Sequence, residues 1–274
     1  MSRSISWTLE AIVKSVTAPQ RPVRRAQTVA RLIERLDRGA TTEIRTARGP
    51  LKVLPQRGPH LAAAAIGFDE EEPETLAWIN KFGPNEILWD IGAATGLLSM
   101  YAALDETCQV FAFEPKAASY SVLVEHLALN DLGGRVFPAC LAFSNKTGLT
   151  HLSLASMAAG SGGNSVDGQP DQFGAHHSVF DQGALAYRMD DFRETFGLAQ
   201  PHHIKIDVDG VESQILEGGP KTLAAVKSVI MEVEGDNAAH AGERLERFLF
   251  AAGLVEDERV RTSGSARNRL YRRA

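Results

Sequence analysis

The amino-acid sequence predicts an α/β protein in which helices cover both faces of an open, doubly wound, mostly parallel sheet. Three observations predict this fold. Short and almost wholly apolar segments recur through residues 70–258, helical segments separate them, and a small-residue turn follows the first apolar segment. Strands that alternate with helices form parallel βαβ units, and strands buried on both faces lose the alternation of polar and apolar residues.

The predicted elements follow one another in a regular order. Two helical pieces, interrupted near Pro19 and Pro22, cover residues 5–38, and a small hairpin around Gly49-Pro50 covers residues 42–56. The strands predicted after it are 86–91, 109–113, 136–142, 203–208 and 228–233. The helices predicted with them are 74–82, 97–104, 117–130, a helix from 212, and 243–252.

These elements divide the chain into three parts. Residues 1–69 form an N-terminal helical and hairpin extension, residues 70–258 the α/β domain, and residues 259–274 a basic C-terminal tail. The net charge of −5 combines +8 over residues 1–60 with −19 over residues 61–258 and six arginines in the tail. The basic residues either coat a solvated helix face or face an anionic acceptor or partner. The acidic central body disfavours nucleic acid as a partner.

The composition of the sequence also bears on the cellular compartment of the protein. No apolar run is long enough for a transmembrane helix, and the N-terminus lacks the apolar core of a secretory signal. The two cysteines, Cys108 and Cys140, lie in separate apolar segments. Two isolated cysteines fit a reducing compartment and make neither a disulfide scaffold nor a zinc site. We therefore expect a cytoplasmic protein, and the sequence does not indicate its oligomeric state.

The strongest local signal is the turn that follows the first predicted strand, residues 90–96, which reads Asp-Ile-Gly-Ala-Ala-Thr-Gly. Small residues let a ligand approach the backbone, and the helix that follows offers free N–H groups. Glu114 ends the next strand, and the carboxyl ends of neighbouring strands meet at the edge where open α/β sheets bind ligands. A carboxylate there can accept hydrogen bonds from both hydroxyls of a ribose.

The turn is selective among nucleoside cofactors. The dinucleotide fingerprint Gly-x-Gly-x-x-Gly is incomplete because Ala94 and Leu97 replace two of its glycines, and the sequence has no phosphate-binding P-loop. A cofactor with a ribose and without phosphate, such as S-adenosylmethionine, fits best. Two alternatives stay open, namely a nucleotide-dependent oxidoreductase and a catalytically silent protein that uses the fold for interactions.

Six sequence blocks occur in order between residues 74 and 235. They are 89–96, 111–115, 129–132, 138–143, 188–192 and 204–212, the last followed by Leu216-Glu217-Gly218 and Ile230-Met231-Glu232. Together they resemble the FkbM family of class I S-adenosylmethionine-dependent methyltransferases. The resemblance implies a Rossmann-like fold and methyl transfer to a hydroxyl of a small molecule or glycan.

The resemblance also implies a set of cofactor-binding residues. Asp90, Gly92 and Gly96 would line the methionine and ribose moieties, Glu114 would hold the ribose hydroxyls, and the segment from Ala142 to Ser144 would approach the adenine. The cofactor-binding turn also includes Ala94. The family usually has asparagine at this position, so the departure predicts a weaker cofactor contact here.

Proton transfer from a hydroxyl acceptor needs a base within hydrogen-bond reach. Asp207 ends the fourth predicted strand at the mouth of the crevice and is the first candidate. The second is His177, in the polar, glycine-rich stretch 156–177, which we predict to be a mobile loop over the acceptor.

Three more acids lie close to Asp207 in the predicted topology. Asp209 and Glu212 have the spacing of a capping box for the next helix. Glu232 stands in an apolar strand, where it needs a partner such as Lys205. Asp207, Asp209 and Glu232 could instead hold a divalent metal through oxygen ligands, but we predict no metal site.

Overall fold

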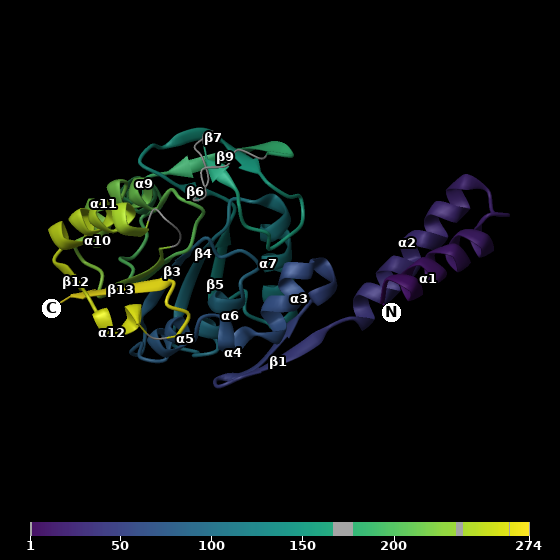
Figure 1. Cartoon of the computed structure of the whole chain (residues 1–274), viewed down its shortest axis with the longest axis horizontal. Helices are drawn as coiled ribbons and strands as arrows, with labels where there is room; N and C mark the ends of the chain where they lie inside the picture. The colour runs from purple at the N-terminus through teal and green to yellow at the C-terminus, as the bar shows by residue number, and fades with distance from the viewer. Residues whose placement is uncertain (1, 167–177, 234–237, 263, 274) are drawn as a thin grey trace. The chain divides into compact units, whose positions relative to one another are not determined.

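The computed structural model describes residues 2–166, 178–233, 238–262 and 264–273 (Figure 1). The chain divides into two compact units, residues 1–42 and 43–274. The first unit is a helical hairpin, α1 (Ser2–Thr17) and α2 (Pro22–Gly39), with the proline-containing break that the sequence predicts.

The boundary between the units lies before the hairpin strands rather than at residue 69. β1 (Thr42–Thr46) and β2 (Gly49–Val53) form a two-stranded sheet whose buried residues, Ile44, Leu51 and Val53, join the core of the second unit. Short helical segments follow: η1 (Pro55–Arg57), α3 (Pro59–Ile66) and α4 (Phe68–Glu71). Burial of Ile44, Leu51 and Val53 explains why the segment β1–β2 belongs to the second unit.

The second unit is built on a seven-stranded sheet of order β12-β13-β11-β10-β3-β4-β5. Its parallel strands are β3 (Ile87–Ile91), β4 (Gln109–Phe113), β5 (Val136–Ala139), β10 (His203–Ile206) and β11 (Ser228–Glu232). β3 pairs with β4 on one side and with β10 on the other, so the strand order reverses at β3. This confirms the predicted doubly wound, mostly parallel sheet, and it places a ligand crevice beside β3.

Helices pack on both faces of this sheet (Figure 1). α5 (Pro73–Ile79), α6 (Leu97–Ala103) and α7 (Ala117–Leu129) contribute to one apolar core, and α8 (Met189–Phe196), α9 (Glu212–Glu217), α10 (Pro220–Leu223) and α11 (Ala238–Ala251) contribute to the other. Successive residues of β3 point to opposite cores, since Trp89 belongs to one and Leu88 to the other. Burial on both faces is the reason that β3 reads as an unbroken apolar run.

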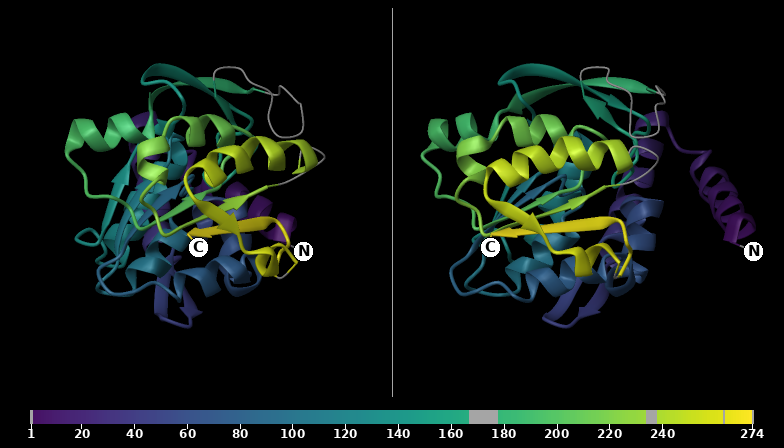
Figure 2. Two further views of the ribbon diagram at one scale, coloured as in Figure 1. Left: turned by 90° about the vertical axis from the view of Figure 1, so that its left-hand side faces the viewer. Right: turned by 60° about the vertical axis from the view of Figure 1, so that its left-hand side comes forward.

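The segment predicted as a basic tail, residues 259–274, contributes to the central sheet instead. After β12 (Leu254–Glu256) and α12 (Glu258–Arg261), β13 (Asn268–Arg273) inserts between β12 and β11 and runs antiparallel to both (Figure 2). Leu270 and Tyr271 are buried in opposite cores. Arginines flank this apolar pair, so the sequence contains no apolar run that marks a strand.

A second sheet of four strands covers the carboxyl ends of the central strands (Figure 2). Its order is β6 (Ala142–Phe143), β9 (Phe180–Tyr187), β7 (Gly148–Leu154), β8 (Ser165–Val166). The sequence does not predict this sheet. The predicted strand 136–142 divides between the two sheets, with β5 in the central one and β6 in the small one.

Candidate active site

A cavity of about 380 Å³ lies at the carboxyl ends of β3, β4 and β10. Gly92, Ala94, Glu114, Ala142 and Asp207 all line it. The structure therefore brings together five of the residues that the sequence predicts for the site. A neighbouring cavity of about 150 Å³ shares Gly92, Ala94 and Asp207 with the first and adds Asp90.

Two glycines of the turn are required for packing. Gly92 has φ = +84°, and a Cβ atom on it would lie 1.9 Å from the carbonyl oxygen of Asp207. Gly96 precedes α6 with φ = +85°, and its Cβ would lie 2.8 Å from the Cδ1 atom of Leu123 on α7. Gly92 thus lets the ends of β3 and β10 meet beneath the cavity, whereas Gly96 faces the α7 helix.

Ala94 adopts the left-handed conformation with φ = +48°. Because this conformation costs an L residue roughly 1–2 kcal/mol, Ala94→Gly is expected to stabilise the protein by about 0.5–1 kcal/mol after allowance for the freer unfolded chain. Urea denaturation measures the change. Ala93→Gly is the matched control, since Ala93 is buried and lacks a positive φ, and it should be destabilising. A loss of stability in both variants would contradict the inference that the backbone of Ala94 is strained.

Glu114 is held rigidly at the cavity. Its Oε2 atom accepts a hydrogen bond of 2.9 Å from the N–H of Ala94, and its Oε1 atom accepts one of 2.8 Å from the N–H of Lys116. Burial raises the pKa of the Glu114 carboxyl to about 7, although both backbone hydrogen bonds oppose this rise. The carboxylate is therefore fixed in orientation, and each oxygen keeps a lone pair for a ligand.

The described part of the predicted loop, residues 156–166, forms one wall of the cavity. The buried Lys116 Nζ atom donates to the Oγ atom of Ser161 at 2.5 Å and to its carbonyl oxygen at 3.2 Å. Asp209 accepts a hydrogen bond of 2.8 Å from the N–H of Asn164. Lys116 is not among the residues predicted from the sequence, where its signal is its place two residues after Glu114. His177 lies outside the described residues.

Asp90 is buried and lines the smaller cavity. Its Oδ2 atom accepts a hydrogen bond of 2.5 Å from the Ser99 hydroxyl, while no donor among the described residues reaches its Oδ1 atom. Burial raises the pKa of Asp90, although Lys205 lowers it in part. A buried carboxylate oxygen without a donor is costly, so this atom is suited to a ligand that carries a donor or a positive charge.

Asp207 forms an ion pair with Lys205, whose Nζ atom lies 2.6 Å from Oδ2 of Asp207 and 3.9 Å from Oε1 of Glu72. Burial lowers the pKa of Lys205, but these carboxylates outweigh it and raise the pKa overall. For Asp207, burial favours the neutral acid, yet Lys205, a hydrogen bond with Glu232 and the charge of Arg267 together lower its pKa. Asp207 is therefore a carboxylate that lines both cavities.

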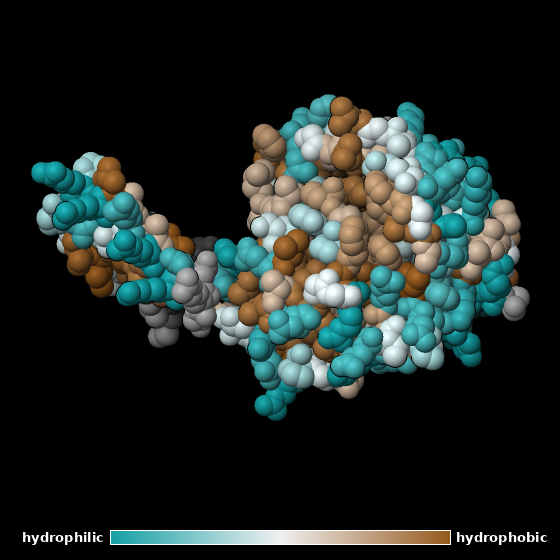
Figure 3. All heavy atoms as spheres, turned by 180° about the vertical axis from the view of Figure 1, so that it is seen from behind, coloured by the Kyte–Doolittle hydropathy of each residue, from teal (hydrophilic) through white to brown (hydrophobic). Residues whose placement is uncertain are grey.

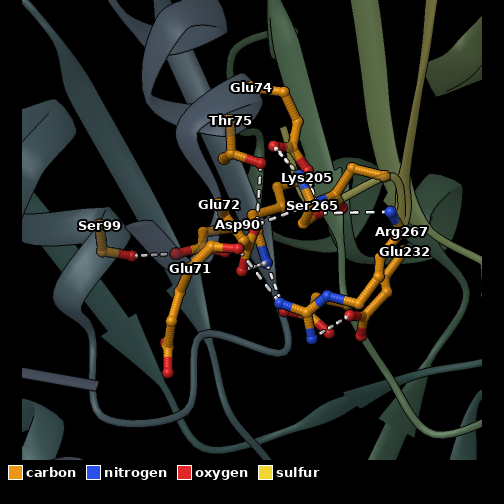
Figure 4. Close-up of polar contacts among 12 residues, drawn as sticks. Glu71, Glu72, Glu74, Thr75, Asp90, Ser99, Lys205, Glu232, Ser265 and Arg267 are labelled. Carbon is orange, nitrogen blue, oxygen red and sulfur yellow. Dashed lines mark hydrogen bonds and ion pairs between the residues drawn. The ribbon is translucent and has the colours of Figure 1, made fainter. Parts of the chain in front are cut away.

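Glu232 has the partner that its burial requires, and that partner is Arg267. The Nη1 atom of Arg267 lies 3.1 Å from Oε1 of Glu232, and its Nη2 atom donates to the carbonyl oxygen of Glu71 at 3.2 Å (Figure 4). Arg267 comes from the segment predicted as a tail, so sequence reasoning missed it. In the part of the chain that the structure describes, no group of three or more His, Cys, Asp and Glu side chains is arranged to hold a metal ion.

The predicted capping box of Asp209 and Glu212 is wrong. α9 begins at Glu212, its N-cap residue is Val211, and no side chain caps it. Glu212 instead accepts a hydrogen bond of 3.1 Å from the N–H of Gly210, and Asp209 faces the cavity wall. Residues 207–211 are irregular and Gly210 has φ = +101°, so the helix begins too late in the chain for Asp209 to cap it.

Three comparisons place the chain among known proteins. Residues 90–256 match the methyltransferase FkbM domain. Hexuronic acid methyltransferase AglP of Haloferax volcanii is 27% identical over 162 residues, which cover 58% of this chain and 57% of that protein. This chain therefore matches little more than half the length of its curated relative.

Two solved structures are similar at low sequence identity. Magnesium protoporphyrin IX methyltransferase from Synechocystis PCC 6803, with bound S-adenosylmethionine, has a TM-score of 0.44 and 11% identity, covering 78% of this chain and 84% of that one. Precorrin-6y C5,15-methyltransferase from Geobacter metallireducens has a TM-score of 0.41 and 14% identity, covering 68% and 72%. The domain match covers more than half of the sequence, and this protein belongs to the FkbM methyltransferase family.

Proposed function

We propose that this protein transfers a methyl group from S-adenosylmethionine to a hydroxyl of a small molecule or glycan. The observation that carries the proposal is the Glu114 carboxylate, fixed by two backbone N–H groups beside the turn 92–94 at one wall of the cavity. Glu114 uses its remaining lone pairs to accept hydrogen bonds from the two ribose hydroxyls.

The other residues of the two cavities fit the rest of this cofactor. Ala142, Phe143, Leu152 and Val166 make an apolar wall, which suits the adenine ring. Oδ1 of Asp90, which no described donor reaches, suits the ammonium group of the methionine moiety. Asp90, Glu114 and the apolar wall thus match the three chemical parts of the cofactor.

The charge around the larger cavity favours a cationic ligand. Two cations, Lys116 and Arg267, face a larger set of acidic side chains, namely Glu71, Glu72, Glu114, Asp207, Asp209 and Glu232. The acids outnumber the cations even with one proton shared between Asp207 and Glu232 and with Glu114 partly protonated. The excess of negative charge attracts a sulfonium ion and loses that attraction once the sulfur becomes neutral. The same field opposes an anionic acceptor, which favours a neutral hydroxyl over a carboxylate.

The cofactor, when bound, supplies an electrophilic methyl group on a cationic sulfur. The chain's own contribution is to hold the acceptor oxygen in line and to remove its proton. Asp207 is held as a carboxylate by Lys205, and its lowered pKa makes it a weak base toward a resting alcohol. An oxygen that is forming a bond to the methyl carbon becomes strongly acidic, so Asp207 takes the proton late in the reaction. His177 remains the second candidate for this role.

We infer the class of methyl acceptor from the charge of the cavity and from the name of one relative. The curated relative is named for hexuronic acid, a sugar acid, and this name supports a sugar as the acceptor. For this chain we propose a sugar or small-molecule hydroxyl, because the acid-rich cavity disfavours a uronate carboxylate.

Binding and transfer measurements test the proposal together. Calorimetry is expected to show binding of S-adenosylmethionine and S-adenosylhomocysteine and none of NAD. Transfer of labelled methyl groups should occur to a neutral sugar rather than to its uronate. Binding of NAD alone would favour an oxidoreductase, and binding of neither cofactor would indicate a catalytically silent protein.

A further inference from the structure

The helical hairpin of the first unit exposes large apolar side chains. Their exposed fractions run from 37% for Leu32 to 75% for Trp7. Figure 3 shows hydrophobic residues, in brown, on the surface of this hairpin. The set is Trp7, Leu9, Ile12, Val16, Val23, Leu32, Ile33 and Leu36. So many exposed apolar side chains on two helices indicate an interaction surface for another molecule or a membrane.

Helical spacing sorts these residues into faces. In α2, Leu32, Ile33 and Leu36 follow one another at one- and three-residue steps and share a side with Val29. Exposed arginines at positions 24, 31 and 35 lie on the opposite side of the same helix. In α1, Leu9, Ile12 and Val16 lie along one face at three- and four-residue steps. Each helix is therefore amphipathic, and the polar side of α2 is cationic.

The two units carry net charges of opposite sign. Residues 1–42 carry eight Lys or Arg against three Asp or Glu, a net charge of +5, so residues 43–274 carry −10. A second copy of the hairpin would have the same +5 charge, which opposes pairing of the two hairpins. An anionic surface matches both the charge and the apolar face.

We propose that the hairpin 2–39 binds the surface of an anionic lipid bilayer. Its apolar side chains insert between the lipid headgroups, and its arginines are attracted by the negative surface potential. An interfacial helix of this kind has a cationic polar face and lies in the plane of the membrane without crossing it. No helix among the described residues is long and apolar enough to span a bilayer.

Flotation of the full-length chain with vesicles tests this proposal. The protein is expected to float with phosphatidylcholine vesicles that contain phosphatidylglycerol and to stay below vesicles of phosphatidylcholine alone. The double variant Leu32→Glu/Ile33→Glu should lower the bound fraction about tenfold or more. Leu149→Glu is the matched control, because Leu149 is 90% exposed in the second unit, and it should float like the wild type.

The remaining outcomes decide against the proposal. Binding to neither vesicle would show that the chain has no affinity for lipid, and equal binding to both would show that negative lipid charge does not attract it. Equal flotation of the double variant and the wild type would show that the hairpin is not the binding surface. A dimer that Leu32→Glu/Ile33→Glu dissociates in the absence of vesicles would assign the apolar face to a second copy. Far-ultraviolet circular dichroism checks that the double variant keeps the helices of the hairpin, because S-adenosylhomocysteine binding reports only on the second unit.

Discussion

Asp207→Asn is expected to slow methyl transfer by about 100-fold or more, the scale of a lost general base. Asparagine keeps the size of the side chain and removes its charge and its ability to take a proton. The affinity for S-adenosylhomocysteine should change little, because Glu114 and the turn 92–94 provide the cofactor contacts in our proposal. Turnover and calorimetry on the same preparation separate these two effects.

The same substitution is also expected to lower stability, by on the order of 2 kcal/mol, because it leaves the buried Lys205 without its nearest counter-ion. Glu72, 3.9 Å from Lys205, remains and limits the loss. Since the pKa of Asp207 is lowered in the folded protein, this stabilisation is present above the ordinary aspartate value near 4 and disappears as the pH falls through the lowered pKa. Urea denaturation at neutral and acidic pH measures it.

Asp209→Asn serves as the matched control for the role of Asp207. Asp209 lines the same cavity and accepts the N–H of Asn164, a hydrogen bond that an amide oxygen can also accept. Its turnover should fall by less than tenfold. Normal turnover in Asp207→Asn would exclude it as the base and leave His177. Loss of activity in both variants, together with inhibition of the wild type by EDTA, would instead indicate a metal-dependent enzyme.

Glu114→Ala is expected to weaken the binding of S-adenosylhomocysteine by about 30- to 1000-fold. The change removes two charge-assisted hydrogen bonds to the ribose, worth about 2–4 kcal/mol together. It also leaves the backbone N–H groups of Ala94 and Lys116 without their acceptor. The melting temperature must therefore be measured beside the affinity. Unchanged binding in a folded variant would contradict the assignment of Glu114.

The pH dependence of binding provides a second test of Glu114. Burial raises the pKa of this carboxyl to about 7. Below that pH the carboxyl becomes protonated in the free protein and loses acceptor capacity, so the wild-type affinity should weaken as the pH falls from 8 to 6. Glu114→Gln carries no titratable group and should bind weakly at every pH. A parallel pH dependence in the two proteins would assign the titration to another residue.

The sequence alone determined the parallel strands of the central sheet and part of the candidate site. The strands β3, β4, β10 and β11 are short apolar runs because both of their faces are buried, and this pattern is local. The turn residues Gly92 and Ala94 and the strand-end acids Glu114 and Asp207 follow from chain order. Parallel neighbours in such a sheet end at the same edge, so residues far apart in sequence meet there.

Only the tertiary structure decided which residues surround these groups. The small sheet pairs β7 with β9 across the segment 156–177, and β13 inserts beside β11 although arginines mask its two apolar residues. Arg267 reaches Glu232 through that insertion, and Ser161 meets Lys116 across 45 residues. These contacts depend on the pairing of distant segments, whose free energy comes from burial in the assembled protein. Neither the periodicity of a local segment nor its turn residues indicate which distant segment it pairs with.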